Sequence, residues 1–175
     1  IEHPIRLWHQ ISASFNRLGK GPNNIALAAI DVAAWDIYAR SLAMPLGLAM
    51  GGASSRAVPI YGSGACYAGQ TPDDAAAAAT RHVRNGYRAV KPRAAGAPSD
   101  RDLLKAVAAV LPGDTQMFVD ANEKCDLVAA HSLLRLAADY NIAFVEEPLP
   151  ANNLAGYRTL AASAPVPIAF GEHSQ

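Results

Sequence analysis

Phe118-Val119-Asp120, Phe144-Val145-Glu146 and Ala169-Phe170-Gly171-Glu172 are three short apolar stretches, and an acidic residue closes each of them. The three acidic residues follow one another at intervals of 26 residues, close to the length of one strand, one helix and the two loops between them. Consecutive parallel strands lie about 4.8 Å apart, so carboxylates at equivalent strand ends converge on one small volume. Like charges so close together repel each other unless a cation holds them. The spacing therefore predicts a metal site formed by Asp120, Glu146 and Glu172.

From residue 58 onward, stretches typical of strands alternate with helical patterns. We expect five strands, at residues 58–61, 87–91, 116–120, 142–146 and 167–171. The first intervening helix has Thr71 as its N-cap and Pro72 in its first turn, and the later ones begin near Ser99, Asp126 and Leu154. Repeated βα units form an open doubly wound sheet or a (β/α) barrel, and polar groups at the C-terminal strand ends favour the barrel. The predicted fold class is α/β, with the first five strands of a TIM-type barrel.

The first 52 residues show a helical pattern instead. Apolar residues recur every three to four positions over residues 4–18, and a second helix is expected over residues 25–42. Because this second helix is apolar on nearly every face, we expect it to be buried. The linker-like stretch at residues 51–56 marks a domain boundary, which divides the chain into residues 1–52 and 53–175. A TIM barrel needs about eight strands, so we expect the chain to be a fragment with an unpaired strand edge, unstable alone.

Two cationic residues close the second expected strand, in Lys91-Pro92-Arg93, 29 residues before Asp120. Residues 91 and 93 point to the same side of a strand, so both can face the carboxylates. Beside a metal-bound acid they could polarise a substrate carboxylate or move a proton. Taken alone, they could also be surface residues at a strand end, or Lys91 could be the Schiff-base lysine of an aldolase barrel. Their place in the repeat favours the first interpretation.

Composition limits the partners and the compartment. The chain is 51% hydrophobic, and its 15 Lys and Arg residues equal its 15 Asp and Glu residues. We therefore expect no binding to nucleic acid or to anionic membranes. The only two cysteines, Cys66 and Cys125, have no metal-type spacing, and the N-terminus has no signal-peptide pattern. We expect a soluble, cytoplasmic protein.

Taken together, these motifs resemble the enolase superfamily. The barrel of that family carries a Lys-x-Lys or related pair after strand two, Asp after strand three, Glu-Glu-Pro or Glu-Asp-Pro after strand four, and a further acid after strand five. The corresponding segments here are Lys91-Pro92-Arg93, Val119-Asp120-Ala121-Asn122, Val145-Glu146-Glu147-Pro148 and Gly171-Glu172. Glu at the last position resembles the mandelate racemase subgroup. Residues 29–37, followed by Gly51-Gly52, look like the end of the superfamily's α+β capping domain, so residues 1–52 would be its C-terminal helical part.

The resemblance implies a role for each candidate residue. Asp120, Glu146 and Glu172 would be Mg²⁺ ligands, and an all-oxygen set independently favours Mg²⁺ over Zn²⁺. Lys91 and Arg93 would be catalytic, with Lys91 stabilising the substrate carboxylate. Asn122 and His173 would contact the substrate. Glu147 is expected to turn away from the site toward a helix, since it alternates with Glu146.

One departure from the family pattern bears on the reaction. Arg93 stands where the second lysine usually acts as a base, and a guanidinium is almost never deprotonated. The resemblance places the family's His base and its Asp partner beyond Gln175. We therefore expect a lyase that abstracts the α-proton of a sugar-acid carboxylate and eliminates water through an enediolate. The alternatives are a racemase or epimerase of a 2-hydroxy acid, or an inactive fragment. We also expect a homo-oligomer.

Overall fold

The computed structural model describes residues 3–15, 21–52, 57–64 and 70–173. The chain divides into two compact units, a first unit up to Val58 and a second unit Pro59–Ser174, and each is described by itself. The predicted end of the first helix at residue 18, most of the linker at residues 51–56 and Cys66 lie outside the described residues. The two units divide between Val58 and Pro59, six residues after the predicted boundary at residue 52.

The first unit is helical, with α1 (Pro4–Ser14), α2 (Gly21–Ser41) and α3 (Leu46–Ala49). His3 caps α1, because its Nδ1 accepts a hydrogen bond from the Ile5 backbone N–H at 3.4 Å. The same imidazole meets the rings of Trp35 and Tyr38 on α2 edge to face, with centroids 5.4 and 4.9 Å apart. This contact joins the two long helices of the unit.

The expectation that the second helix is buried is wrong for this unit. Leu27 and Ala39 are the buried residues of α2, whereas Ile25 is 71% and Val32 is 70% exposed. Within the unit, α2 packs against α1 and α3. Two shorter helices cannot cover every face of a 21-residue helix, so an all-round apolar pattern leaves exposed apolar residues.

Parallel strands form the sheet structure of the second unit. Their bounds are β1 (Gly62–Ser63), β2 (Ala89–Lys91), β3 (Gln116–Met117), β4 (Val119–Asp120), β5 (Val145–Glu146) and β6 (Ile168–Ala169). They pair as β1-β2-β3 and β4-β5-β6, and every pairing is parallel. Backbone hydrogen bonds join the two sets: Phe118 N–H donates to Val90 O, and Val119 N–H donates to Phe144 O. Residues 116–120 therefore act as one strand with neighbours on both sides, as predicted.

The first strand lies later than predicted. Residues 58–61 were expected to form it, but β1 is Gly62–Ser63, with Gly62 opposite Val90. Pro59 cannot donate a backbone hydrogen bond to a neighbouring strand, which disfavours pairing at the predicted position. Gly62 also suits the close approach of α4, since a Cβ there would overlap the His82 imidazole.

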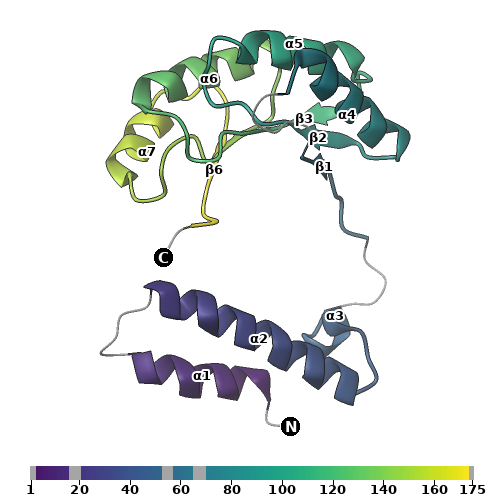
Figure 1. Ribbon diagram of the computed structural model, residues 1–175, viewed down its shortest axis with the longest axis vertical. Coiled ribbons are helices and arrows are strands. Elements are labelled where there is room, and N and C mark those ends of the chain that lie inside the picture. Colours follow the sequence, from purple (N-terminus) through teal and green to yellow (C-terminus); the bar gives the residue numbers. More distant parts are fainter. Residues whose placement is uncertain (1–2, 16–20, 53–56, 65–69, 174–175) are drawn as a thin grey trace. The chain divides into compact units, whose positions relative to one another are not determined.

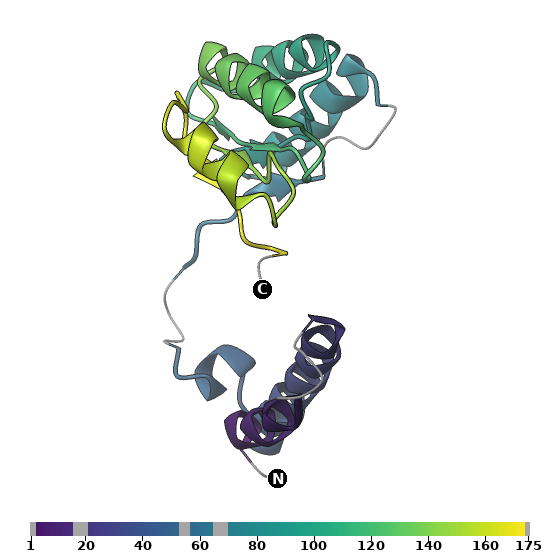
Figure 2. The same cartoon turned by 90° about the vertical axis from the view of Figure 1, so that its left-hand side faces the viewer.

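Helices follow the strands on one face of the sheet (Figures 1 and 2). They are α4 (Pro72–Arg84), α5 (Asp100–Val110), α6 (Leu127–Asp139) and α7 (Leu154–Ala161). Apolar residues of these helices and of the strands make the core between them, including Leu104, Leu133, Val90, Val119 and Val145. These helices do not cover the opposite face of the strands. The polar side chains at the strand ends lie on that opposite face. The observed order of strands and helices is the predicted α/β arrangement.

Side chains at the helix starts explain where the helices begin. Thr71 Oγ1 accepts from Asp74 N–H at 3.2 Å, while the Asp74 carboxylate accepts from Thr71 N–H at 3.1 Å, so α4 has a complete capping box. Ser99 precedes α5 as predicted but makes no side-chain cap bond. The buried Asp100 instead accepts hydrogen bonds from the backbone of Ala95 and Ala97, which fixes the loop after β2.

In the part of the chain that the structure describes, no helix has both the length and the apolar character needed to cross a membrane.

Candidate active site

The polar residues at the strand ends come together through strand register. Asp120 on β4 lies opposite Glu146 on β5, and Arg93 forms a parallel bridge with Asp120. Lys91, at the end of β2, lies two residues before Arg93. Residues two apart on a strand share a face, so the register places these four side chains along one edge of the parallel array.

Lys91 joins the two carboxylates. Its Nζ lies 2.5 Å from Glu146 Oε2 and 3.7 Å from Asp120 Oδ2. Lys91 and Asp120 are both buried, each 7% exposed. Burial alone would lower the pKa of Lys91, but Glu146, Tyr61 and Asp120 together raise that pKa above its ordinary value. The amine is therefore a cation at neutral pH, which disfavours a Schiff-base role because that role needs a neutral amine.

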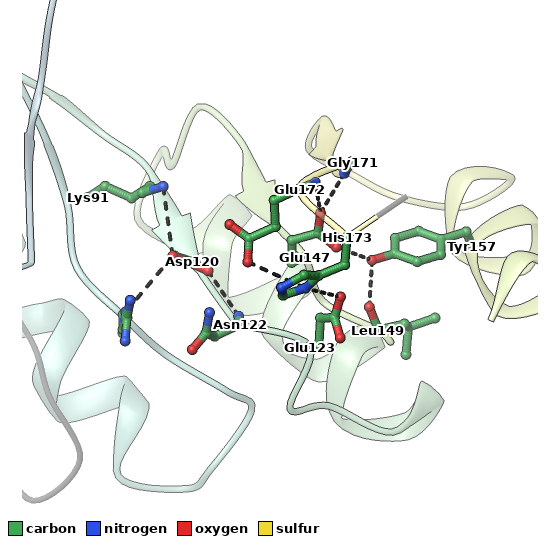
Figure 3. A network of polar contacts seen from close by, with 11 residues as sticks. Lys91, Asp120, Asn122, Glu123, Glu147, Leu149, Tyr157, Gly171, Glu172 and His173 are labelled. Carbon is green, nitrogen blue, oxygen red and sulfur yellow. Dashed lines mark hydrogen bonds and ion pairs between the residues drawn. The ribbon is translucent and has the colours of Figure 1, made fainter. Parts of the chain in front are cut away.

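Arg93 and Asn122 both contact Asp120, in different ways. Arg93 Nε lies 3.9 Å from Asp120 Oδ2, and its side chain is partly exposed. The backbone N–H of Asn122 donates to Asp120 Oδ1 at 2.9 Å, which holds the carboxylate from the other side (Figure 3). Asn122 has a φ of +52°, in the left-handed region that suits Asn at a turn. Asp120 is thus fixed between a side-chain cation and a backbone donor.

Glu172 lies beyond the strand position that its spacing suggests. Glu146 pairs with Ala169, so Glu172 comes three residues after the register partner and follows a turn at Gly171, where φ is +139°. Its side chain is 47% exposed. The equal spacing of 26 residues therefore corresponds to strand register for Asp120 and Glu146 but not for Glu146 and Glu172. Among the residues described, no group of three or more His, Cys, Asp or Glu side chains is placed to hold a metal ion.

His173 pairs with a carboxylate that sequence reasoning missed. Its Nδ1 lies 2.9 Å from Glu123 Oε1 and 3.7 Å from Glu172 Oε1. The hydrogen bond with Glu123 raises the pKa of His173 above its ordinary value. Glu123 lies in the loop after β4 with a φ of +60°, and no periodicity marks a loop residue of this kind. The pair places His173 next to Glu172 at the edge of the site (Figure 3).

Glu147 is the second carboxylate whose part in the site the sequence reasoning did not predict. It is 1% exposed and turned away from Glu146, as alternation predicts. Its carboxylate nevertheless reaches the end of β6, where Oε1 accepts from the backbone N–H groups of Gly171 and Glu172. A signal for this contact existed in the sequence, since a carboxylate inside an apolar stretch must find hydrogen-bond donors.

An aromatic row lies on the same strand face, below the charged residues. Phe118 and Phe144 come two residues before Asp120 and Glu146, and their rings stack with centroids 4.3 Å apart. Tyr61 meets Phe118 edge to face at 5.1 Å, and Lys91 Nζ lies 5.3 Å from the Tyr61 ring centroid. Tyr61 is 39% exposed, whereas Phe118 and Phe144 are partly buried.

The chemistry of this donor set fits Mg²⁺. Asp120, Glu146 and Glu172 offer only hard carboxylate oxygens, which Mg²⁺ prefers. Asp120 and Glu146 already approach one common cation, the Lys91 ammonium, so this position stabilises positive charge.

Two family models match the chain. The model of the enolase C-terminal domain-like family matches residues 74–175. The model of the mandelate racemase/muconate lactonizing enzyme N-terminal domain matches residues 1–51. The two matches together leave residues 52–73 between them.

Individual proteins are similar over nearly the whole chain. An o-succinylbenzoate synthase of Geobacillus stearothermophilus is 32% identical over 173 residues, which is 98% of this chain and 44% of that protein. An L-talarate/galactarate dehydratase of Salmonella typhimurium is 30% identical over 168 residues, which is 95% of this chain and 41% of the dehydratase. The chain thus spans less than half the length of these relatives.

A solved structure agrees with the sequence matches. The crystal structure of an enolase from Bradyrhizobium, complexed with magnesium and mandelic acid, matches with a TM-score of 0.84 and 29% identity. The match covers 97% of this chain and 47% of that one. Sequence motifs, family models and fold agree: the chain belongs to the mandelate racemase/muconate lactonizing enzyme family of the enolase superfamily.

Proposed function

We propose that this chain carries part of the active site of a Mg²⁺-dependent lyase, which removes the α-proton of a sugar-acid carboxylate and eliminates water. The observation that carries the proposal is the Lys91 cation between Asp120 and Glu146 at the C-terminal strand ends. A similar protein is an L-talarate/galactarate dehydratase, whose name describes water loss from a sugar acid.

Asp120, Glu146 and Glu172 would hold the metal ion. When bound, Mg²⁺ supplies Lewis-acid stabilisation of negative charge on the substrate carboxylate. Lys91 adds a fixed positive charge beside that position, so it stabilises the charge that develops when the α-proton leaves. In the metal-free protein, Glu146, Tyr61 and Asp120 together raise the pKa of Lys91. Asn122 and His173 would contact the substrate from the loops after β4 and β6.

Arg93 would orient the substrate by donating hydrogen bonds to a carboxylate or hydroxyl group. It cannot take the α-proton, because its guanidinium stays protonated. We propose that the residue that abstracts the α-proton lies in a region that this chain does not include, corresponding to the part of the longer relatives that the chain does not span. One base on one face of the substrate suffices for elimination. The base takes the α-proton, and the leaving hydroxyl group takes a proton from an acid and departs as water.

Racemisation or epimerisation of a 2-hydroxy acid is the second candidate function. The observation that favours it is the similar Bradyrhizobium structure, whose ligands are magnesium and mandelic acid. Racemisation needs proton transfer on both faces of the α-carbon. Arg93 opposes it for the reason just given.

Turnover of a panel of sugar acids and 2-hydroxy acids in D₂O distinguishes the two functions. For a lyase, the full-length protein should release a dehydrated keto acid, and deuterium should enter one stereochemical position only. The Arg93→Lys variant should keep the reaction type at lower activity, because a two-pronged contact is lost. Deuterium in both enantiomers without any dehydrated product would contradict the lyase and support the racemase.

The metal assignment has its own test. Glu172→Gln should weaken Mg²⁺ binding, measured by calorimetry, and abolish turnover while the circular dichroism spectrum is unchanged. Asp114→Asn is the matched control, because Asp114 is an exposed carboxylate that pairs with Arg88. Equal Mg²⁺ affinity in both variants would show that Glu172 is not a ligand.

A further inference from the structure

Among the described residues, the strand hydrogen bonds end before Glu172. The last pairing contact along this strand is the hydrogen bond from Glu147 N–H to Ala169 O, at 2.9 Å. Gly171 follows with a φ of +139°, a conformation open to glycine and strained for other residues. In the described part of the chain, the backbone at Gly171 and Glu172 is therefore held by contacts other than the strand ladder.

The Glu147 carboxylate supplies those contacts. Its Oε1 accepts from Gly171 N–H at 2.5 Å and from Glu172 N–H at 3.1 Å (Figure 3). A carboxylate that accepts two backbone N–H groups makes strong, charge-assisted hydrogen bonds. These two amides are the ones next to the expected third metal ligand.

Glu147 is itself held from several directions. Its φ is +44°, and its backbone O accepts from Glu123 N–H at 2.7 Å. Its Oε2 lies 3.1 Å from the hydroxyl oxygen of Tyr157, whose single O–H is shared between this carboxylate and Leu149 O, 2.6 Å away. The Tyr157 ring stacks on Phe170, directly before Gly171, with centroids 4.6 Å apart. Backbone and side-chain contacts together leave the Glu147 carboxylate little freedom.

A buried carboxylate of this kind is not explained by stability alone. Burying a charge costs free energy, and well-packed apolar residues often replace buried ionic groups without loss of stability. One carboxylate oxygen of Glu147, Oε1, accepts from two consecutive amides, those of Gly171 and Glu172. We propose that Glu147 is a positioning residue, which fixes this segment and thereby directs the Glu172 carboxylate toward the metal site. The inference rests on the proposed function, because it takes Glu172 as a metal ligand.

Glu147→Gln tests the inference with little change in volume. We expect hydrogen–deuterium exchange at the Gly171 and Glu172 amides to speed up, because a neutral amide is a weaker acceptor than a carboxylate. Mg²⁺ affinity of the full-length protein, measured by calorimetry, should fall roughly tenfold or more, the range for residues that orient metal ligands. Mn²⁺ as a spectroscopic probe should report an altered coordination environment.

Asp100→Asn is the matched control. Asp100 is also a buried carboxylate that accepts two backbone N–H groups, but these belong to Ala95 and Ala97. This variant should speed exchange at those two amides and leave Gly171, Glu172 and Mg²⁺ affinity unchanged. Tyr157→Phe keeps the ring and removes only the hydroxyl, so it should shift exchange at Gly171 and Glu172 in the same direction as Glu147→Gln but by less. If Glu147→Gln does not fold, the Tyr157→Phe variant still tests the inference.

Two results would overturn the inference, and they are distinguishable. Unchanged amide exchange or unchanged Mg²⁺ affinity in Glu147→Gln, with affinity lost in Glu172→Gln, would show that Glu147 does not position the ligand. Unchanged affinity in Glu172→Gln itself would show instead that the proposed ligand set is wrong.

Discussion

At the scale of single residues, Lys91 is a buried cation between two carboxylates. It lies 2.5 Å from Glu146 and 3.7 Å from Asp120, and its side chain is 8% exposed. Removing one partner of such a group leaves uncompensated charge, which is costly inside a protein. The Lys91 ammonium and a bound Mg²⁺ would share the same carboxylates, so the charge balance of the site depends on both.

Lys91→Met should therefore destabilise the metal-free protein, by about 2 kcal/mol because Glu146 keeps some contact with water. Mg²⁺ should restore more stability to this variant than to the wild type, since the ion then supplies the missing positive charge. Urea denaturation with and without Mg²⁺ measures both effects. Lys105→Met, at an exposed position of α5, is the control and should change neither. An equal response of Lys91→Met and wild type to Mg²⁺ would contradict this account.

The sequence allowed part of the site to be predicted, for a physical reason. Lys91, Asp120 and Glu146 end strands, and strand register alone brings them together. Glu123 contacts His173 because of the conformation of the loop after β4. Glu147 contacts the Glu172 amide because its side chain reaches the end of β6. Such contacts depend on positive φ angles and on packing between distant segments, which no periodic pattern encodes.

At the scale of elements, the helix starts follow local rules closely. The capping box of α4 joins Thr71 and Asp74 through reciprocal hydrogen bonds, and Pro72 occupies the first turn. These contacts lie within four residues, so sequence alone predicts them. The start of α5 differs, because Ser99 makes no side-chain cap bond and Asp100 instead accepts hydrogen bonds from the preceding loop.

Thr71→Ala should lower the free energy of unfolding by about 1 kcal/mol, the usual cost of losing an N-cap side chain. Hydrogen bonds with Thr71 lower the pKa of Asp74 below its ordinary value. The pKa of Asp74 is lower in the folded than in the unfolded protein. The ionised Asp74 carboxylate therefore stabilises the folded protein fully at pH values above its ordinary pKa, and this stabilisation is lost as the pH falls through the folded-state pKa. The difference between wild type and Thr71→Ala should thus shrink in acid.

Thr80→Ala is the control for this prediction, because the Thr80 hydroxyl donates within the same helix to Ala76 O and caps nothing. Thermal unfolding at neutral and acidic pH measures all three proteins. A Thr71→Ala effect no larger than that of Thr80→Ala would contradict the role of the capping box.

Strand extents were less predictable than helix starts. Apolar alternation predicted strands of four or five residues, while the observed ladders pair only two or three residues each. In a parallel array each segment needs correctly placed neighbours, and pairing ends where a neighbour turns away. The shift of β1 to Gly62–Ser63 has the same origin, since its position follows from Val90 on β2 and from His82 on α4.

At the scale of the whole molecule, the second unit exposes apolar surface at one end of the parallel array. In the described part of the chain β6 is an edge strand, because it pairs with β5 alone. Beside it, α7 and β6 form an apolar pocket lined by Leu154, Tyr157, Arg158, Ala161, Ile168 and Phe170. Leu154 is 61% and Phe170 is 51% exposed. An edge strand next to exposed apolar side chains favours association with other chains.

The 175-residue chain on its own should therefore bind a hydrophobic dye and associate as its concentration rises. Leu154→Lys should reduce both effects, because it places a charge at the rim of the pocket beside the open edge. Val128→Lys is the matched control: Val128 is 76% exposed on α6, and it does not line the pocket. Analytical ultracentrifugation and dye fluorescence measure the two variants against the wild type. If the wild-type chain is monomeric and does not bind the dye, or if both variants lower association equally, the pocket and the β6 edge are not the cause.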